Sequence, residues 1–386
     1  MIIPEVKTLD EILNSHLFIL AQKLVEYTPI TINWVSPIKN FEKLSFEGIN
    51  LYKIPALNIP KIQIFSNFYL LRKNLSKIKD KVCLASAIIP ALSGIYSKKI
   101  TIAYLIEEKS RFKLTNKSNL LVRTYIPLFQ EMEYHMIRKA HVIAATNKSL
   151  LPWLKKVVPN KKIIHIPWGV NTEFYNPIQD KSKLQKLKDE LGNDIIEKKI
   201  MMYTGGALPG HGVDFLIKAF GMLKKKYKEY KNNLILLLVG PVLRQDLLTI
   251  VKESGLELNK DVKFLGWQDF RKIPLFHQLA DILVLPARPL PGALMGQAKI
   301  GEYLSSGRPI LTSDIDVASD LTHNIHICKF KVNNYKDFID KAIYLLKNDD
   351  YRIKLAENSR KYAEKYLDYK KIIKKFETII KFCYNY

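Results

Sequence analysis

Cysteine is scarce in this sequence, and the three present, Cys83, Cys328 and Cys383, lie far apart without the spacing of a metal-ligand set. An odd number of isolated cysteines does not build a disulfide framework, so we expect a reduced compartment. No apolar run approaches the roughly 20 residues that cross a bilayer. The opening MIIPEVKTLDEIL is acidic too early and apolar too briefly for a signal peptide. The sequence therefore predicts a cytoplasmic protein whose membrane contact can only be peripheral.

Acidic residues are also few relative to basic ones. There are 37 Asp and Glu against 61 Lys and Arg, which gives a net charge of +24. Such an excess favours a polyanionic partner: nucleic acid, anionic lipid headgroups or phosphorylated substrates. No nucleic-acid recognition motif is present, so we expect no nucleic-acid partner. An equally good explanation for part of the charge is a genome or habitat that favours lysine.

The length and composition indicate two globular domains. A chain of 386 residues is long for one ordinary domain and sufficient for two, each with its own core. Alternating strand and helix patterns run through the first half and restart at Lys198. We find no Ser/Gly-rich linker, low-complexity segment or further repeat, so short structured crossings are expected between the domains.

The most informative stretch runs from Asp281 to Leu311. It reads as a buried strand, Ile282 to Leu285, then a Gly/Pro loop, then a helix from Gln297 that carries Lys299 and Glu302 three residues apart on one face. A strand that leads through such a loop into a helix N-terminus favours anion binding, because free amides and the helix dipole point the same way. A cation and a carboxylate beside them suit a nucleotide-sugar. The alternative is an ordinary turn with a surface Lys–Glu pair.

A second loop of this kind opens the second half. A strand from Lys198 to Tyr203 precedes the loop TGGALPGHG, which contains Gly205, Gly206 and His211, and a helix from Val213 to Tyr227 follows. Four glycines allow a ligand to approach the backbone closely. Further on, Trp267 follows the strand Val262 to Leu265, where it could stack on a base or sit at the edge of the core.

These residues carry a family resemblance. The pattern Lys299-x-x-Glu302-Tyr303-Leu304-x-x-Gly307-x-Pro309 resembles the donor-site helix of GT-B glycosyltransferases, specifically the retaining family 4 type. The segments 133–146 and 169–177 resemble the family's end of the N-terminal domain and its interdomain segment. The resemblance implies an α/β fold of two doubly wound, Rossmann-like domains that face a cleft. It implies an acceptor-binding domain over 1–167, a nucleotide-sugar-binding domain over 168–366, and a C-terminal helix over 367–386 that crosses back to the first domain.

The resemblance also implies roles for single residues. Glu302 is expected to hold the ribose hydroxyls. The family's Glu that meets the transferred sugar is replaced by Leu294, which lies between Gly292 and Gly296 in the donor loop. The family's Arg near Ala207 and its Lys at position 211 are absent, so His211, Lys299 and Arg288 are candidates for the charge that holds the diphosphate. Gly205, Gly206 and Trp267 complete the expected donor site.

The predicted activity is the transfer of a sugar from a UDP- or GDP-sugar to a lipid-linked or glycan acceptor, with retention, and without a cofactor or metal. Catalytic candidates are Lys299 and the pair Glu107 and Glu108, which follow the strand Ile100 to Ile106 at an edge where ligands of open sheets lie. The basic segments Lys61 to Lys81 and Lys109 to Arg123 favour an anionic membrane surface, or are simply solvated. A nucleotide-sugar epimerase, or a degenerate protein of this fold that only binds a nucleotide or a partner, remains an alternative.

Overall fold

The chain divides into two compact units. The computed structural model describes residues 16–37, 44–46, 48–54, 63–85, 88–105, 120–208, 210–242, 244–288, 297–315 and 318–385. Unit 1 comprises Met1–Pro167 together with Tyr369–Tyr386, and unit 2 comprises Trp168–Asp368. The sequence analysis placed the first boundary after Pro167 and the second after Tyr366. Leu367 and Asp368 belong to unit 2 because Val170 N–H donates to the Leu367 carbonyl at 2.8 Å and Thr172 Oγ1 donates to Asp368 Oδ2 at 2.5 Å.

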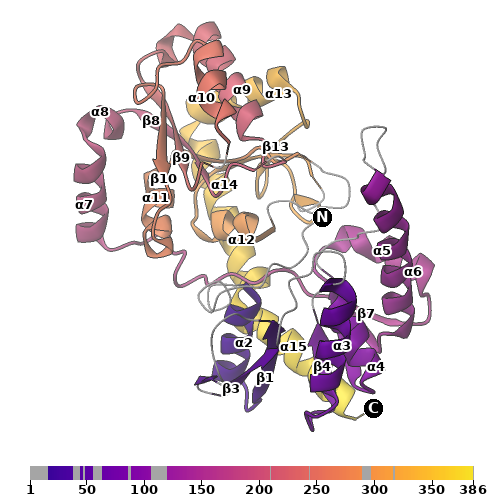
Figure 1. Cartoon of the computed structure of the whole chain (residues 1–386). Helices are drawn as coiled ribbons and strands as arrows, with labels where there is room; N and C mark the ends of the chain where they lie inside the picture. Colours follow the sequence, from indigo (N-terminus) through magenta and orange to yellow (C-terminus); the bar gives the residue numbers. More distant parts are fainter. Residues whose placement is uncertain are drawn as a thin grey trace. The chain divides into compact units, whose positions relative to one another are not determined.

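Unit 2 is built on one parallel sheet of six strands in the order β10-β9-β8-β11-β12-β13 (Figure 1). The strands are β8 Lys199–Thr204, β9 Leu234–Val239, β10 Val262–Gly266, β11 Ile282–Leu285, β12 Ile310–Ser313 and β13 Cys328–Phe330. All five pairings between them are parallel. Four-residue to six-residue apolar runs such as LILLLV in β9 suit a sheet covered on both faces.

Helices cover both faces of this sheet, and the strand residues alternate between them. Met201 and Tyr203 of β8 join the core under α9, α10 and α13, whereas Ile200 and Met202 join the core under α7, α11 and α12. Unit 2 is therefore doubly wound, as expected for a Rossmann-like domain. Its helices are α7 Lys181–Leu191, α8 Asn193–Ile196, α9 Val213–Lys226, α10 Asp246–Glu253, α11 Ile273–Leu279, α12 Gln297–Ser305, α13 Tyr335–Lys347 and α14 Asp349–Tyr362, with the short η3 Lys228–Tyr230 and η4 Phe270–Lys272 and the π-helical η6 Ala363–Leu367.

The described strands of unit 1 form two sheets. One is parallel, in the order β4-β5-β6-β7, and the other has the order β1-β3-β2, with β2 antiparallel to β3. The strands are β1 Ile32–Pro37, β2 Leu44–Phe46, β3 Ile49–Ile54, β4 Val82–Ala85, β5 Ile100–Leu105, β6 Val142–Ala145 and β7 Lys162–His165. The helices are α2 His16–Tyr27, α3 Gln63–Leu75, α4 Ile88–Tyr96, α5 Leu120–Lys139, α6 Leu151–Val157 and α15 Tyr369–Tyr384, with the short η2 Lys148–Leu150.

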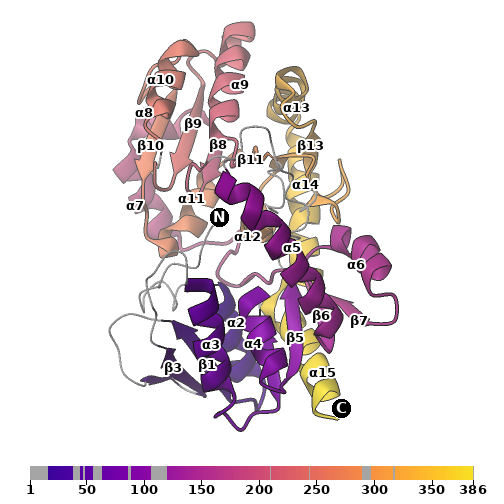
Figure 2. The same ribbon diagram turned by 45° about the vertical axis from the view of Figure 1, so that its right-hand side comes forward.

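The C-terminal helix α15 belongs to the core of unit 1. Its apolar face, including Ile372, Phe376 and Ile379, packs with Leu20 of α2 and Tyr104 of β5 (Figure 2). On the opposite face, lysines such as Lys374 are exposed. A strongly amphipathic sequence thus gives a helix that covers the sheet on one side and faces solvent on the other.

Most expected strands and helices are present, and the errors lie at their ends. The sequence pattern predicts a strand from Ile325 to Phe330, but the strand begins only at Cys328, because Asn324 adopts φ 62° and its N–H donates to the Ile327 carbonyl at 2.9 Å in a turn. The pattern also predicts a helix from Tyr351 to Tyr366, and this helix begins earlier, at Asp349, and continues beyond Tyr362 as a π-helix. None of the helices in the described part of the chain is long and apolar enough to cross a membrane.

Candidate functional site

The candidate site lies where the order in which the chain adds strands to the sheet of unit 2 reverses. From β8 the chain proceeds to β9 and β10 on one side, whereas from β11 it proceeds to β12 and β13 on the other. The loops that follow β8 and β11 therefore diverge from neighbouring strands, and such a switch point is where open α/β sheets bind ligands. The two loops are in contact, because Arg288 N–H donates to the Gly210 carbonyl at 2.7 Å.

Glycines make this contact possible. Gly212 has φ 74° directly before α9, and a side chain there would collide with the Pro286 carbonyl of the loop after β11. Gly205 has φ 124° directly after β8, and a Cβ there would lie 2.8 Å from Lys299 Nζ. Both positions need glycine for the backbone conformation, and Gly212 also needs it for the space, because its neighbour is a backbone carbonyl. The glycine loop expected from the sequence therefore lies at the end of β8, and the space that Gly205 leaves there is occupied by the end of the Lys299 side chain. We call this space the seat of Lys299.

Lys299 is placed against this seat. It lies in the first turn of α12, and its ammonium is 5.7 Å from the centre of the Tyr203 ring. Burial lowers its pKa, and the nearby Glu302 carboxylate partly opposes this shift. Among the described residues, no carboxylate forms an ion pair with it. A desolvated cation without a paired carboxylate favours an anionic ligand at this point.

Glu302 is half-buried one turn further along α12. Within the described ranges its carboxylate makes no hydrogen bond or ion pair, so its oxygens can accept from a ligand. The structure therefore brings Gly205, Lys299 and Glu302 together, as the sequence predicted for a donor site. The charge of Lys299 and the acceptors of Glu302 lie on one helix, three residues apart.

His211 is held by its neighbours. Its Nδ1 lies within hydrogen-bond distance of the Gly206 carbonyl and 3.1 Å from the Tyr203 hydroxyl. A carbonyl only accepts, so Nδ1 carries the hydrogen, and in the neutral ring Nε2 is then an acceptor. Burial and the Lys299 charge lower the pKa of His211. In this arrangement His211 can donate from Nε2 to a phosphate only when the ring is protonated, so its role as a candidate cation depends on pH.

Arg288, a candidate for the charge that holds the diphosphate, is paired with a carboxylate of unit 2. Its Nη1 lies 3.0 Å from Asp214 Oδ2 in the first turn of α9, and Arg244 Nη1 lies 3.3 Å from Oδ1 of the same carboxylate. Two arginines thus share one aspartate. The Nε of Arg288 is buried without a partner in the described part of the chain. Arg288 retains donor capacity near the glycine loop, but Asp214 neutralises much of its charge.

Trp267 follows β10 and is 75% exposed. The interpretation of Trp267 as a core-edge residue is therefore wrong, and an exposed indole at the carboxyl edge of the sheet is available for stacking. Gly206 lies in the same loop as Gly205, and its carbonyl accepts from Tyr203 at 3.0 Å. Other candidates lie outside the described residues: Glu107, Glu108, Gly292, Leu294 and Gly296. Among the side chains that are described, no three His, Cys, Asp or Glu residues are grouped as metal ligands.

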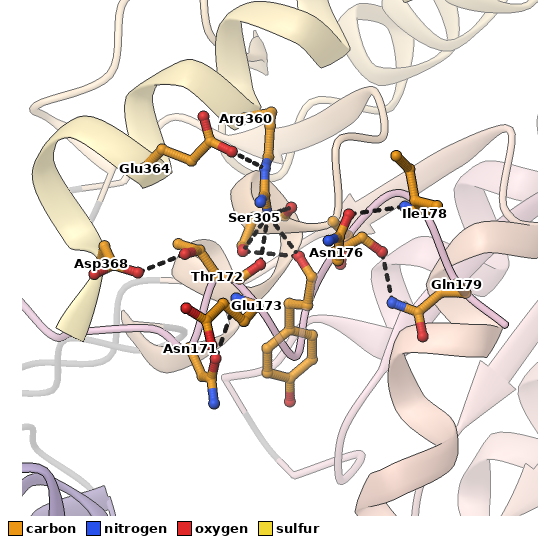
Figure 3. A network of polar contacts seen from close by, with 12 residues as sticks. Asn171, Thr172, Glu173, Asn176, Ile178, Gln179, Ser305, Arg360, Glu364 and Asp368 are labelled. Atoms are coloured by element: carbon orange, nitrogen blue, oxygen red, sulfur yellow. Dashed lines mark hydrogen bonds and ion pairs between the residues drawn. The ribbon is translucent and has the colours of Figure 1, made fainter. Parts of the chain in front are cut away.

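A half-buried arginine fixes the carboxyl end of α12. Arg360 of α14 donates from Nη1 to the carbonyls of Thr172, at 2.8 Å, and of Ser305, at 2.7 Å (Figure 3). Its Nε donates to Glu364 at 2.6 Å. A cation at a helix C-terminus also suits the helix dipole. The helix that carries Lys299 and Glu302 is therefore held firmly at the end opposite the glycine loop.

Two residues that shape the site are not among the site residues expected from the sequence. Tyr203 lies under the Lys299 ammonium and bonds to His211, and Asp214 holds Arg288. Tyr203 was assigned only to the expected strand, and Asp214 only to the expected helix. Their positions next to a glycine loop are the one signal that could have identified them.

Known proteins resemble this chain in sequence and in structure. Residues 198–348 match the family model of glycosyl transferases group 1. An uncharacterized glycosyltransferase of Haemophilus influenzae is 23% identical over 343 residues, which cover 86% of each chain. Sucrose-phosphate synthase from Thermosynechococcus elongatus has a TM-score of 0.76 at 14% identity, over 96% of this chain and 93% of its own. The HepE protein of Anabaena, solved with UDP and glucose, has a TM-score of 0.69 at 13% identity, over 91% of this chain and 99% of its own.

These findings confirm the resemblance to GT-B glycosyltransferases and the fold class. The chain has the α/β fold of GT-B glycosyltransferases, with parallel sheets and covering helices. Residues 198–348 of it, which include β8, α9, β11 and α12, form a glycosyl transferases group 1 domain. Gly205, His211, Trp267, Arg288, Lys299 and Glu302 all lie within this stretch.

Proposed function

We propose that this protein transfers a hexose from a nucleotide-sugar to an acceptor, with retention of the anomeric configuration. The observation that carries the proposal is the half-buried Lys299 ammonium beside Gly205, which forms no ion pair with any described carboxylate. The Glu302 carboxylate lies one turn further along α12. An anionic group and a pair of hydroxyls, separated by a short distance, are the chemical features that this arrangement would bind. The group 1 domain match supports sugar transfer, and retention rests on the family resemblance alone.

In this mechanism the protein acts mainly on the leaving group. Departure of the sugar leaves a nucleoside diphosphate whose negative charge has increased. Lys299 and the backbone amides at the start of α9 stabilise that charge, which lowers the barrier because the charge is greater in the transition state than in the bound donor. Glu302 accepts from the ribose hydroxyls, and Trp267 stacks on the base. The HepE structure contains UDP, so a UDP-sugar is the first donor to test, with a GDP-sugar second.

The acceptor is proposed to be lipid-linked or a glycan, bound through unit 1 at an anionic membrane face. Supporting this, Arg72 and Lys73 in the last turn of α3 and the following Lys77 are exposed. Leu71 of the same helix is buried, and Ser97, which follows α4, donates from its hydroxyl to the Arg72 carbonyl at 3.1 Å. We therefore assign the attraction for the lipid to the exposed cations. Glu107 and Glu108 are proposed to orient or deprotonate the acceptor hydroxyl, on sequence grounds alone.

A ligand screen tests the donor site. Thermal denaturation is followed with UDP-, GDP- and ADP-sugars for the wild type, Lys299→Ala and Lys218→Ala, the last an exposed lysine of α9. We expect one sugar nucleotide to raise the midpoint for the wild type and Lys218→Ala, but not for Lys299→Ala. Equal stabilisation of all three proteins would refute the role of Lys299. Binding without transfer to any acceptor would indicate a degenerate protein, and conversion of the donor alone would indicate an epimerase.

Vesicle co-sedimentation tests the membrane contact. Arg72, Lys73 and Lys77 are changed together to Glu, and a control changes Lys181, Lys183 and Lys186 of α7, which are also exposed. The two triple variants have the same net charge. Each cation at an anionic surface contributes on the order of 1 kcal/mol, so only the α3 variant should lose binding to anionic vesicles. High salt should release the wild type, because the Debye length falls to about 3 Å at 1 M. Equal loss in both variants would mean that only total charge matters.

A further inference from the structure

Buried polar side chains connect the end of β8 to the end of α12. The hydroxyl of Tyr303, in α12, accepts from Thr204 N–H at 2.8 Å and lies 3.2 Å from Thr204 Oγ1. His277, in α11, places Nε2 3.1 Å from Thr204 Oγ1 and Nδ1 2.7 Å from Ser306 Oγ. Ser306 Oγ in turn donates to the Glu302 carbonyl at 2.9 Å. His277, Tyr303 and Ser306 have no exposed surface.

Counting the available hydrogens shows which group donates and which accepts in each hydrogen bond of this network. The Glu302 carbonyl only accepts, so it takes the single hydrogen of the Ser306 hydroxyl. Ser306 Oγ must then accept from His277, which places a hydrogen on Nδ1 and leaves Nε2 as an acceptor. The Thr204 hydroxyl then donates to His277 Nε2, and the Tyr303 hydroxyl donates to Thr204 Oγ1. In this arrangement every donor of the network has an acceptor. The opposite tautomer leaves one hydroxyl hydrogen of the Thr204–Tyr303 pair without an acceptor among the described residues.

The charge state of the ring supports a fixed arrangement. Burial lowers the pKa of His277 to about 3, so the imidazole is neutral at any physiological pH. The same desolvation raises the pKa of Tyr303, which therefore keeps its proton. The His277 ring is also packed between two aromatic rings, stacked on Tyr175 with 5.7 Å between centroids and edge-on to Tyr303 at 5.1 Å. Neither its protonation nor its orientation is free to change.

The two ends of this hydrogen-bond network lie next to residues of the candidate site. Thr204 directly precedes Gly205, the seat of Lys299, and Ser306 is bonded to the backbone of Glu302. A shift of α12 along its axis would separate Lys299 from Gly205. It would at the same time break the hydrogen bonds between Tyr303 and Thr204 and between His277 and Ser306. Buried networks in which every group is satisfied specify a single arrangement.

We propose that His277, as the Nδ1–H tautomer, is a positioning residue that sets the register of α12 against β8 and so places Glu302 and Lys299 for the donor. The inference rests on the proposed function for its consequence, although the tautomer itself does not. His277 touches neither the ligand nor the reacting atoms. It acts through Thr204 at one end and Ser306 at the other.

We call the hydrogen bonds that join Thr204, His277 and Ser306 the relay. Two conservative variants test it by removing the hydroxyl at one end or the other. Thr204→Val and Ser306→Ala each remove one hydroxyl while His277 is retained. We expect each to weaken UDP binding about tenfold, the equivalent of one ordinary hydrogen bond. The double variant should bind UDP no more weakly than either single variant, since both changes break the same relay. Unchanged affinity with lower thermal stability would overturn the proposal, and so would two independent losses that add.

A control variant separates positioning from loss of stability. Asp261→Asn weakens the buried ion pair with Lys224, at 2.5 Å, which lies at the amino end of β10, the edge of the sheet opposite to the candidate site. It should lower thermal stability and leave UDP affinity unchanged. If it weakens UDP binding as much as Thr204→Val does, general destabilisation explains the effect and the relay is not needed.

Two NMR measurements need no ligand. Long-range proton–nitrogen correlation of the histidine rings should show His277 with its hydrogen on Nδ1, and a hydrogen on Nε2 would overturn the proposal. Carbon-detected titration of Lys299 should give a pKa below that of an ordinary lysine, and Ser306→Ala should raise it as α12 shifts and the ammonium becomes solvated. A Lys299 pKa that Ser306→Ala leaves unchanged would also overturn it. A wild type that binds no nucleotide, with both NMR results as expected, would count against the proposed function and not against the relay.

Discussion

Replacing Gly205 by alanine is the most direct perturbation of the candidate site. The residue has φ 124°, which L-residues rarely adopt, and the new Cβ would lie 2.8 Å from Lys299 Nζ, with the Lys299 Cε closer still. The backbone term alone costs about 1–3 kcal/mol. The clash is with the far end of a flexible side chain, so Lys299 can swing away, and we expect that movement to remove the cation from the site.

The expected result has two parts. Because unit 2 contains about 200 residues, a loss of about 2 kcal/mol corresponds to a fall of roughly 4–8 °C in the denaturation midpoint. Nucleotide affinity should fall as far as it does in Lys299→Ala, although the lysine is still present. In a Lys299→Ala background, Gly205→Ala should cost less stability, because only the backbone term remains.

A matched control isolates the backbone term. Gly255 has φ 72° and would place a Cβ in open space, with nothing within 4 Å. Gly255→Ala should therefore lower stability by about 1 kcal/mol and leave nucleotide affinity unchanged. The measurements are thermal denaturation and titration with the sugar nucleotide identified by the screen. If Gly205→Ala keeps the affinity of the wild type, the ammonium does not need its seat at Gly205, and our account of the site is wrong.

Three further predictions concern single side chains. Glu302→Ala should weaken nucleotide binding by about 1.5–3 kcal/mol, the usual range for hydrogen bonds to a charged group, while Glu357→Gln on the exposed side of α14 should have no effect; isothermal titration of both decides the point. His211 binds an anion only when protonated and its pKa is lowered, so affinity for a sugar nucleotide should rise as pH falls below about 6.5, and a His211→Gln variant that keeps this dependence would contradict us. The folded-state pKa of His277, about 3, lies below the unfolded value near 6.5, so between these limits only the unfolded chain binds the proton. The free energy of unfolding therefore decreases as the pH is lowered, by up to about 1.4 kcal/mol per pH unit. Urea midpoints at pH 7 and 5 should differ less for His277→Gln than for the wild type.

The strands and helices of unit 2 could be predicted from sequence because their signals are local. The run LILLLV is apolar on both faces, and the structure has β9 over those same residues, Leu234–Val239. Glycine spacing located the loop after β8, and the helix from Gln297 begins where the Gly/Pro loop ends. Element ends were less certain, as at Cys328, because a turn competes with a short strand through contacts that periodicity does not record.

The sequence by itself determined which residues could form an anion site, since a glycine loop, a helix N-terminus and a nearby Lys–Glu pair are local patterns. Only the tertiary structure decided how they combine. Strand order places β8 beside β11, and this brings Lys299 to Gly205, His277 to Thr204 and Arg288 to Asp214 across 73 or more residues of chain. Burial then fixes the chemistry: it lowers the pKa values of Lys299 and His277, and it makes hydrogen-bond partners necessary for the hydroxyls of Thr204, Tyr303 and Ser306. Neither the pairing of distant residues nor the water they lose is encoded in any short stretch of sequence, so both had to come from the folded chain.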